Sequence, residues 1–399
     1  MKKIKFILNL FLLLLIYIYV SYISLLPENI FLINGQKYDI KRLLGIELVE
    51  IQETSQENLE STNVEVKLLG KINIKNIKIT SIDDAKVVPV GKVIGLKLYS
   101  NGVLVVGLTE IEDKNNVLKK SYENSDLKAG DTILEIDEKQ VENINSLKNI
   151  IDESNGKKMD MTILRNGTII NTSIMPIEIE EKKYQLGLWV KDAATGVGTM
   201  TFYEPQSGGF GILGHGITDS DTNNLINIER GELVTAKIFS IQKGIKDNPG
   251  EIKGTIVNQP TIGIINKNTS FGVYGVLNNL TSLNIDITKA IEVAQRNEIE
   301  EGEAEIFCSI NSSNVAKKYK IEIEKIYYDN NYNNKSMLIK IIDEELLEET
   351  GGIIRGLSGA PIIQNGKFVG AVTNVLVSDP QIGYAVFADI MLKELNEID

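Results

Sequence analysis

The chain of 399 residues contains one cysteine, Cys308, and one histidine, His215, and this scarcity excludes several classes of protein. A single cysteine cannot form a disulfide within the chain. A structural zinc site takes four Cys or His ligands, and a catalytic zinc site usually takes two or three His. The sequence also contains no Gly-Lys-Ser/Thr phosphate loop. We therefore expect a protein that works without a metal or a cofactor.

The formal net charge is −12, because 54 Asp and Glu residues outnumber 42 Lys and Arg residues. Nucleic-acid binding depends on Lys and Arg side chains that neutralise phosphates, so we expect no nucleic-acid partner. Cys308 has the apolar neighbours Ile306, Phe307 and Ile310. This pattern is typical of a strand with a buried thiol, which predicts a structural rather than a reactive cysteine.

The first 26 residues predict a membrane anchor or a signal segment. Three lysines stand within the first five residues, and Phe6 to Leu26 is almost wholly apolar. About 20 such residues cross a bilayer as a helix, and the lysines place the N-terminus in the cytoplasm and the rest outside. A cleaved signal peptide is the alternative, although the Ser-Leu-Leu-Pro that follows is a poor cleavage site. In either case we expect an exported protein.

Residues 27–84 predict a linker or stalk. The stretch from Gln52 to Asn63 is rich in Glu, Ser, Thr and Gln, a composition that disfavours a packed core. The alternation of apolar and polar residues between Val64 and Ile79 indicates short strands.

Residues 85–180 predict a compact α/β unit. It contains Leu127-Lys-Ala-Gly-Asp131, an amphipathic helix around Leu147 to Ile151, and a hairpin that turns at Asn166-Gly167. These features resemble a PDZ domain, which binds an extended peptide as an added strand beside a helix. By position, the carboxylate-binding loop and edge strand are Gly95, Leu96, Lys97 and Leu98. The alternative is that these glycines only punctuate strands.

Residues 181–399 contain short apolar runs separated by Gly, Asn and Asp, the pattern of an all-β barrel or sandwich. One segment, Gly356-Leu-Ser-Gly-Ala-Pro361, has the glycines that a nucleophilic serine needs. A tight turn exposes the hydroxyl and directs backbone amides at a developing oxyanion. Trypsin-like peptidases present their nucleophile on such a turn. By this analogy Ser358 would be the nucleophile, and the amides of Gly356 and Ser358 would be the oxyanion donors. The alternative is a glycine-rich β-turn.

His215 is flanked by Gly214 and Gly216, which leave its imidazole approachable. Its ordinary pKa suits proton transfer near neutral pH. A serine that needs an imidazole base has no other candidate in this chain, although a lone histidine can also be purely structural. For the acid that would orient the imidazole, the residues alone leave four candidates, which are Asp219, Asp221, Asp286 and Asp343.

Two long motifs resemble the sporulation peptidases of the SpoIVB family. They are Phe210-Gly-Ile-Leu-Gly-His-Gly-Ile217 and Leu347-Glu-Glu-Thr-Gly-Gly-Ile-Ile-Arg-Gly-Leu-Ser-Gly-Ala-Pro-Ile-Ile-Gln-Asn-Gly-Lys367. The resemblance implies a trypsin-like double β-barrel over 181–399 and a catalytic triad of His215, Asp343 and Ser358. Two departures are Ala360, where relatives often have Ser, and Asn374, where relatives often have His; the second leaves His215 as the only imidazole.

The same resemblance implies a biological role. Members of the family are released from the forespore into the space between its two membranes. They cut themselves and then a membrane-bound regulator of an intramembrane metalloprotease, which leads to sigma-factor activation in the mother cell. Two other functions fit the sequence: a tethered PDZ scaffold on an inactive peptidase fold, and a chaperone that binds unfolded chains.

Overall fold

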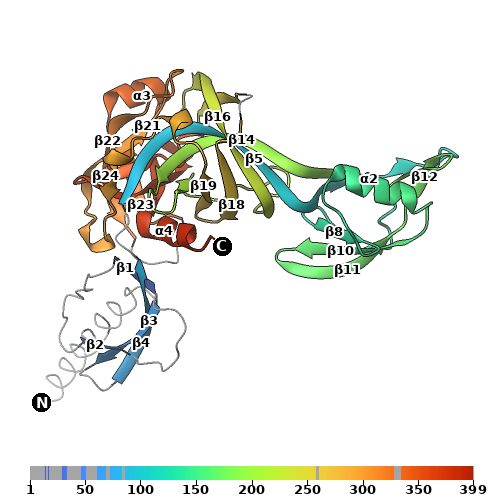
Figure 1. Cartoon of the computed structure of the whole chain (residues 1–399), viewed down its shortest axis with the longest axis horizontal. Coiled ribbons are helices and arrows are strands. Elements are labelled where there is room, and N and C mark those ends of the chain that lie inside the picture. The colour runs from blue at the N-terminus through green and yellow to red at the C-terminus, as the bar shows by residue number, and fades with distance from the viewer. Residues whose placement is uncertain are drawn as a thin grey trace, which may run out of the picture.

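The computed structural model describes residues 29–33, 46–50, 61–68, 72–82, 86–257, 260–327 and 334–398, together with Leu14 and Tyr17. Strands dominate this part of the chain (Figure 1). None of the helices described there is long and apolar enough to cross a membrane. Apart from Leu14 and Tyr17, the predicted anchor over 1–26 lies outside the described residues.

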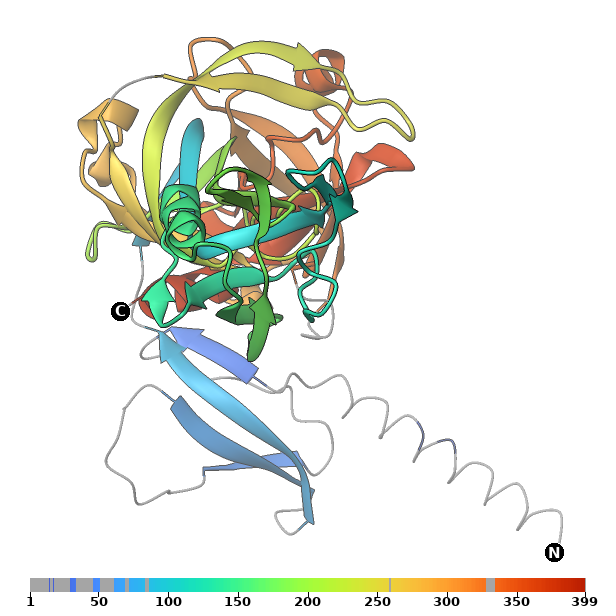
Figure 2. The same cartoon turned by 90° about the vertical axis from the view of Figure 1, so that its right-hand side faces the viewer.

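A small sheet precedes the main body and lies below it in Figures 1 and 2. Its strands, in the order β1-β4-β3-β2, are β1 (Asn29–Ile33), β4 (Ile72–Ile82), β3 (Ser61–Leu68) and β2 (Ile46–Glu50). The strands predicted between Val64 and Ile79 are therefore confirmed. Those residues of the predicted linker that the structure describes form strands of this sheet, and most of the polar stretch 52–63 lies outside the described residues.

Six strands pair in a closed ring, which we call the first barrel. The pairings run from β5 through β14, β15, β19, β18 and β16 and return to β5. These strands are β5 (Lys86–Leu108), β14 (Leu188–Tyr203), β15 (Gly209–Ile212), β19 (Gly272–Leu277), β18 (Gly263–Thr269) and β16 (Ile228–Gln242). Buried side chains such as Ile94, Phe210 and Val273 fill its interior. The ring is flanked by β17 (Glu251–Ile256), β20 (Ile291–Glu292) and the 3₁₀ turns η1 (Thr281–Leu283), η2 (Ile287–Lys289) and η3 (Arg296–Glu298).

A second closed barrel follows in sequence. Its strands, in ring order, are β21 (Gly302–Cys308), β22 (Lys317–Ile326), β23 (Met337–Ile341), β26 (Asp379–Phe387), β25 (Lys367–Leu376) and β24 (Pro361–Gln364). Along β22, Tyr319, Ile321 and Ile323 are buried while the residues between them are exposed, as the two-residue period of a strand requires. Cys308 lies in this core, and burial raises the pKa of its thiol far above the usual range, so the prediction of a structural cysteine is confirmed.

The two barrels pack against each other through the largest apolar cluster of the described residues. Val93, Ile238 and Ile252 from the side of the first barrel join Ile339 and Ile362 of the second barrel. Helix α3 (Glu344–Thr350) contributes Leu346 to this cluster, and helix α4 (Ala388–Asn396) packs against both barrels. This mainly β arrangement fits the predicted trypsin-like domain.

An α/β lobe with its own core is inserted between β5 and β14. It contains β6 (Ile111–Glu112), β7 (Leu118–Lys119), β8 (Thr132–Ile136), β9 (Lys139–Gln140), α2 (Ile144–Glu153), β10 (Met159–Arg165), β11 (Thr168–Ile174), β12 (Ile177–Glu180) and β13 (Lys183–Gln185). Helix α2 begins at a capping box formed by Asn143 and Ser146. The predicted apolar face, Leu147, Ile150 and Ile151, is buried.

Strands β5 and β14 continue from the first barrel into the lobe without interruption (Figure 1). Ile94 of β5 lies in the core of the first barrel, while Val103 of the same strand lies in the core of the lobe. The boundary predicted at residue 85 therefore precedes a strand that belongs to both units. The prediction that Gly95 to Leu98 form an edge strand is wrong, because β14 pairs with one side of this segment and β16 with the other.

Candidate active site

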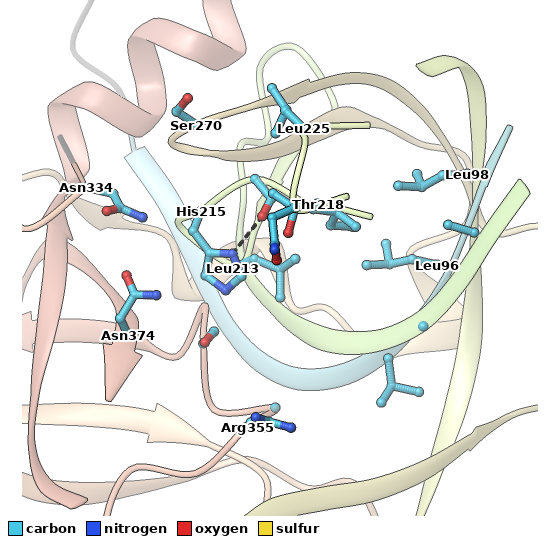
Figure 3. A pocket seen from close by; sticks show the side chains of 18 of the residues that line it. Leu96, Leu98, Leu213, His215, Thr218, Leu225, Ser270, Asn334, Arg355 and Asn374 are labelled. Atoms are coloured by element: carbon cyan, nitrogen blue, oxygen red, sulfur yellow. Dashed lines mark hydrogen bonds between the residues drawn. The ribbon is translucent and has the colours of Figure 1, made fainter. Parts of the chain in front are cut away.

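His215 and Ser358 line the same pocket, which has a volume of about 750 Å³. They come from different barrels, since His215 follows β15 and Ser358 precedes β24. In Figure 3, His215 lies between Asn334 and Asn374 on one side and Leu213 and Leu96 on the other. Much of the remaining lining comes from β5, β14 and the serine loop: Leu98, Ala194, Thr195, Gly196, Val197, Arg355 and Gly356.

The two glycines beside His215 allow its loop to pack closely against other segments. A Cβ at Gly214 would lie 3.1 Å from side-chain atoms of Thr373 and Val386 in the second barrel. A Cβ at Gly216 would lie 2.4 Å from the carbonyl oxygen of Thr269. Larger residues at these positions would push the loop out of place. Gly214 and Gly216 therefore allow the loop to take this position, in addition to leaving the imidazole ring accessible.

The surroundings of His215 leave its ring neutral and ready to accept a proton. Nδ1 lies 2.9 Å from the carbonyl oxygen of Gly216, shown by the dashed line in Figure 3. A carbonyl oxygen only accepts hydrogen bonds, so Nδ1 carries the proton and Nε2 keeps its lone pair. Burial lowers the pKa of the imidazole from its ordinary value of 6.5, more than the Gly216 carbonyl raises it. Near neutral pH, Nε2 can therefore act as a base.

The loop after His215 is held at its base by Asn268 of β18. The side-chain oxygen of Asn268 accepts from the amide of Ile217 at 2.9 Å. Its side-chain nitrogen donates to the carbonyls of Ile217 at 2.9 Å and Ile226 at 2.8 Å. Three hydrogen bonds from one side chain thus fix both ends of the loop. Nothing in the sequence around Asn268 marks this function.

Asp219 and Asp221 shape this loop. The buried carboxylate of Asp219 accepts hydrogen bonds from the amides of Asp221 and Thr222, both at 3.0 Å. Lys191 of β14 lies 3.0 Å from the other oxygen of Asp219 and also pairs with Asp221. In the described part of the chain, neither aspartate bonds to His215, so these two candidates for the orienting acid serve the loop instead.

Ser358 lies in a turn that is pressed against the first barrel. Gly359 has φ +93°, and a Cβ there would lie 2.3 Å from the carbonyl oxygen of Thr199. The requirement for glycine next to Ser358 therefore follows from both conformation and space. The hydroxyl of Ser358 donates to the carbonyl of Thr373 in β25 at 2.6 Å. In this resting arrangement it is bonded to β25 rather than to the imidazole.

The backbone amides around Ser358 alternate between engaged and free. Those of Leu357 and Gly359 donate to the carbonyls of Ile354 and Val372, at 3.0 and 2.7 Å. Those of Gly356 and Ser358 donate to no acceptor among the described residues. Two free amides one residue apart at the edge of a pocket fit an oxyanion hole. The Thr199 hydroxyl fixes the loop from the first barrel by donating to the Gly356 carbonyl at 2.6 Å.

The structure does not bring Asp343 or Asp286 to His215. Asp343 is the N-cap of α3, where it accepts from the amides of Leu346 and Lys320, both at 3.1 Å. It is absent from the described lining of the pocket. Asp286 caps η2 in the same way. The catalytic role of Asp343 stays a prediction, and the contact that orients the His215 ring here is the Gly216 carbonyl.

The family model described as SpoIVB peptidase S55 matches residues 182–392. No curated protein matches the chain significantly. The matched range extends from β13 into α4 and includes His215, Gly356 and Ser358. Because it covers more than half of the sequence, the chain belongs to the SpoIVB peptidase family and is a serine peptidase, a hydrolase of peptide bonds.

Proposed function

We propose that the chain is an endopeptidase in which Ser358 is the nucleophile and His215 the general base. One observation carries this proposal: a single pocket contains Ser358, a neutral imidazole and the two free amides of Gly356 and Ser358. These are the groups that acyl transfer requires.

The reaction begins when the Ser358 hydroxyl leaves the Thr373 carbonyl and turns to His215. Nε2 takes the hydroxyl proton while Oγ bonds to the carbonyl carbon of the substrate, and the amides of Gly356 and Ser358 bind the oxyanion. The imidazolium then gives its proton to the departing amine, and the C–N bond breaks. Water, deprotonated by His215, attacks the acyl-enzyme, and the proton returns to Ser358 as the ester bond breaks.

We assign the orientation of His215 to the Gly216 carbonyl, which holds the proton on Nδ1 as the carboxylate does in a Ser-His-Asp triad. A neutral carbonyl stabilises the imidazolium less than a carboxylate does. We therefore expect a slow enzyme unless substrate binding rearranges the site. Asp343 acts in this account as the cap of α3.

We further propose that the lobe is a PDZ-type peptide-binding module. Its support is the helix α2 packed on a small sheet with a separate core, together with the resemblance of the Leu127-Lys-Ala-Gly-Asp131 segment. We also propose the biological role that the family resemblance implies, with membership of the SpoIVB peptidase family as its support. It consists of self-cleavage and of cutting a membrane-bound regulator, by a protein exported from the forespore and tethered through residues 1–26.

A fluorophosphonate probe, which reacts with activated serines, tests the mechanism. We expect the wild-type chain to be labelled and Ser358→Ala and His215→Ala to remain unlabelled. Ser270→Ala is the matched control, because Ser270 lines the same pocket and is exposed; this variant should be labelled like the wild type. Labelling of Ser358→Ala would refute the assignment of the nucleophile. Mass spectrometry of the mature N-terminus, compared between wild type and Ser358→Ala, tests self-cleavage.

A further inference from the structure

One edge of β14 is unpaired over residues 188–197. The opposite edge pairs with β5 along the whole strand. β15 pairs with the free side only from Met200 onwards, and no other described strand joins it before that point. Ala193, Thr195 and Gly196 are exposed, and a Cβ at Gly196 would meet no atom within 4 Å. This stretch therefore presents backbone amides and carbonyls to solvent.

The free edge connects the pocket with the lobe. At one end, residues 194–197 line the pocket that contains His215 and Ser358. At the other end, the first amide of α2, at Ile144, donates to the side chain of Asp192 at 2.8 Å. Figure 1 shows β14 running from the first barrel to α2. A chain lying along this edge would start beside the reacting groups and end beside a helix.

The part of the edge next to the pocket, residues 193–197, lacks the protection that exposed strands usually have. Proteins guard edges with prolines, bulges or outward-pointing lysines. From Ala193 to Val197, β14 keeps an uninterrupted register with β5 and contains no proline, whereas the register shifts twice between Trp189 and Ala193, towards the lobe. The lysine next to this run, Lys191, is already engaged with Asp219 and Asp221. An unguarded edge that opens into an active site is an expected place for strand addition.

We propose that β14 is the strand on which this peptidase binds its substrate: an extended polypeptide segment pairs with the free edge of residues 188–197, from the pocket to α2. The inference rests on the proposed function, since it defines how the substrate of that pocket is bound. At about 3.3 Å per residue, the ten residues span about 30 Å. The enzyme would therefore recognise about eight to ten residues on one side of the cleaved bond, mostly through their backbone.

The chain contains a single tryptophan, Trp189, which reports on this edge. Its side chain is 66% exposed and lies over Gly107, where a Cβ would be 3.4 Å from the indole ring. A peptide paired with β14 would partly cover the indole and change its fluorescence. Trp189→Phe keeps the backbone edge and removes the signal, so it serves as the control.

The test uses the full chain with Ser358→Ala, which binds without cutting, and a displayed library of random fourteen-residue peptides. Selected peptides should shift the fluorescence of Trp189 and slow hydrogen exchange of the amides in 188–197. Synthetic versions with one N-methylated amide each should lose affinity with a period of two. We expect a loss of about threefold to tenfold where the amide faces β14, the worth of one hydrogen bond, and little change at the positions between.

Several results would overturn the inference: no selected binder, protection on another edge, a loss of affinity without the period of two, or protection of 188–197 without peptide at concentrations where the chain dimerises. The last would mean that a second copy occupies the edge. Failure of the proposed function is seen separately, by fluorophosphonate labelling of the wild type. If Ser358 is labelled but the affinity losses show no period of two, only the proposed binding on β14 is rejected. If Ser358 is not labelled but the losses do show the period of two, only the proposed catalytic mechanism is rejected.

Discussion

Replacing Asn268 with alanine should release the loop that carries His215 while leaving the serine loop in place. The substitution removes three hydrogen bonds of 2.8–2.9 Å, which tie the backbone of Ile217 and Ile226 to β18. Because Ile217 is two residues from His215, the position of the imidazole depends on these bonds. Ser358 and its two free amides belong to the second barrel and do not use them.

The magnitude follows from the number of bonds. Each hydrogen bond contributes about 1 kcal/mol net, so the loop loses about 3 kcal/mol of support. Since about 1.4 kcal/mol corresponds to a factor of ten, the ordered loop can become up to about 100-fold less populated. Water will replace part of the lost bonding, so we expect the rate of serine labelling to fall by about 10-fold to 100-fold.

Asn314→Ala is the matched control. The Asn314 side chain also clamps a backbone segment, accepting from the amide of Val93 at 2.9 Å and donating to its carbonyl at 2.7 Å. Asn314 has φ +50°, and alanine in this conformation costs about 1 kcal/mol more. Its total loss of stability should therefore resemble that of Asn268→Ala. It lies outside the described lining of the pocket.

The assay combines urea unfolding with the rate of fluorophosphonate labelling. We expect both variants to lose stability by similar amounts and Asn268→Ala alone to lose labelling rate. If Asn268→Ala loses stability but is labelled at the wild-type rate, the loop does not depend on Asn268 and the reasoning fails. If both variants are labelled slowly, general destabilisation explains the effect.

Four further predictions concern the same site and the second barrel. Burial lowers the pKa of His215, so the labelling rate should fall at acid pH with a midpoint below 6.5. Because the unfolded chain then binds the proton more readily than the folded chain, the free energy of unfolding should fall as the pH drops through the folded pKa. Thr199→Val removes the hydroxyl that donates to the Gly356 carbonyl. Because one hydrogen bond of about 1–1.5 kcal/mol is lost, the labelling rate should fall about tenfold, while the affinity for the probe should stay unchanged. Asp343→Asn keeps a residue that caps helices well, so its rate of labelling should stay within about twofold of the wild-type rate. A large loss of labelling rate would establish Asp343 as the acid that orients His215. Iodoacetamide should leave Cys308 unmodified in the folded chain and modify it in denaturant, because burial raises its pKa.

Much of the local structure could be predicted because it depends on neighbouring residues. Asn166-Gly167 and Asn365-Gly366 adopt the positive φ angles that their hairpins need, and α2 forms where its apolar spacing indicates. The pairing of His215 with Ser358 followed from scarcity, since the chain has no second imidazole. The structure confirms that both residues line one pocket.

The tertiary structure alone decided which strands are neighbours. The glycine-containing segment Gly95 to Leu98 has the composition of a peptide-binding edge, yet it pairs with residues 194–197 and 231–234, each about a hundred or more positions away in sequence. The free edge belongs to β14 instead. The family resemblance implies that Asp343 is the triad acid, but Asp343 caps a helix beside the second barrel.

The sequence by itself thus determined the tight serine turn, the only available base and the family. Turn conformation and helix periodicity are set within a few consecutive residues. The tertiary structure decided which carbonyl orients the imidazole, which asparagine holds its loop and which strand edge remains open. These features depend on contacts between distant segments, and such contacts leave no local pattern in the chain.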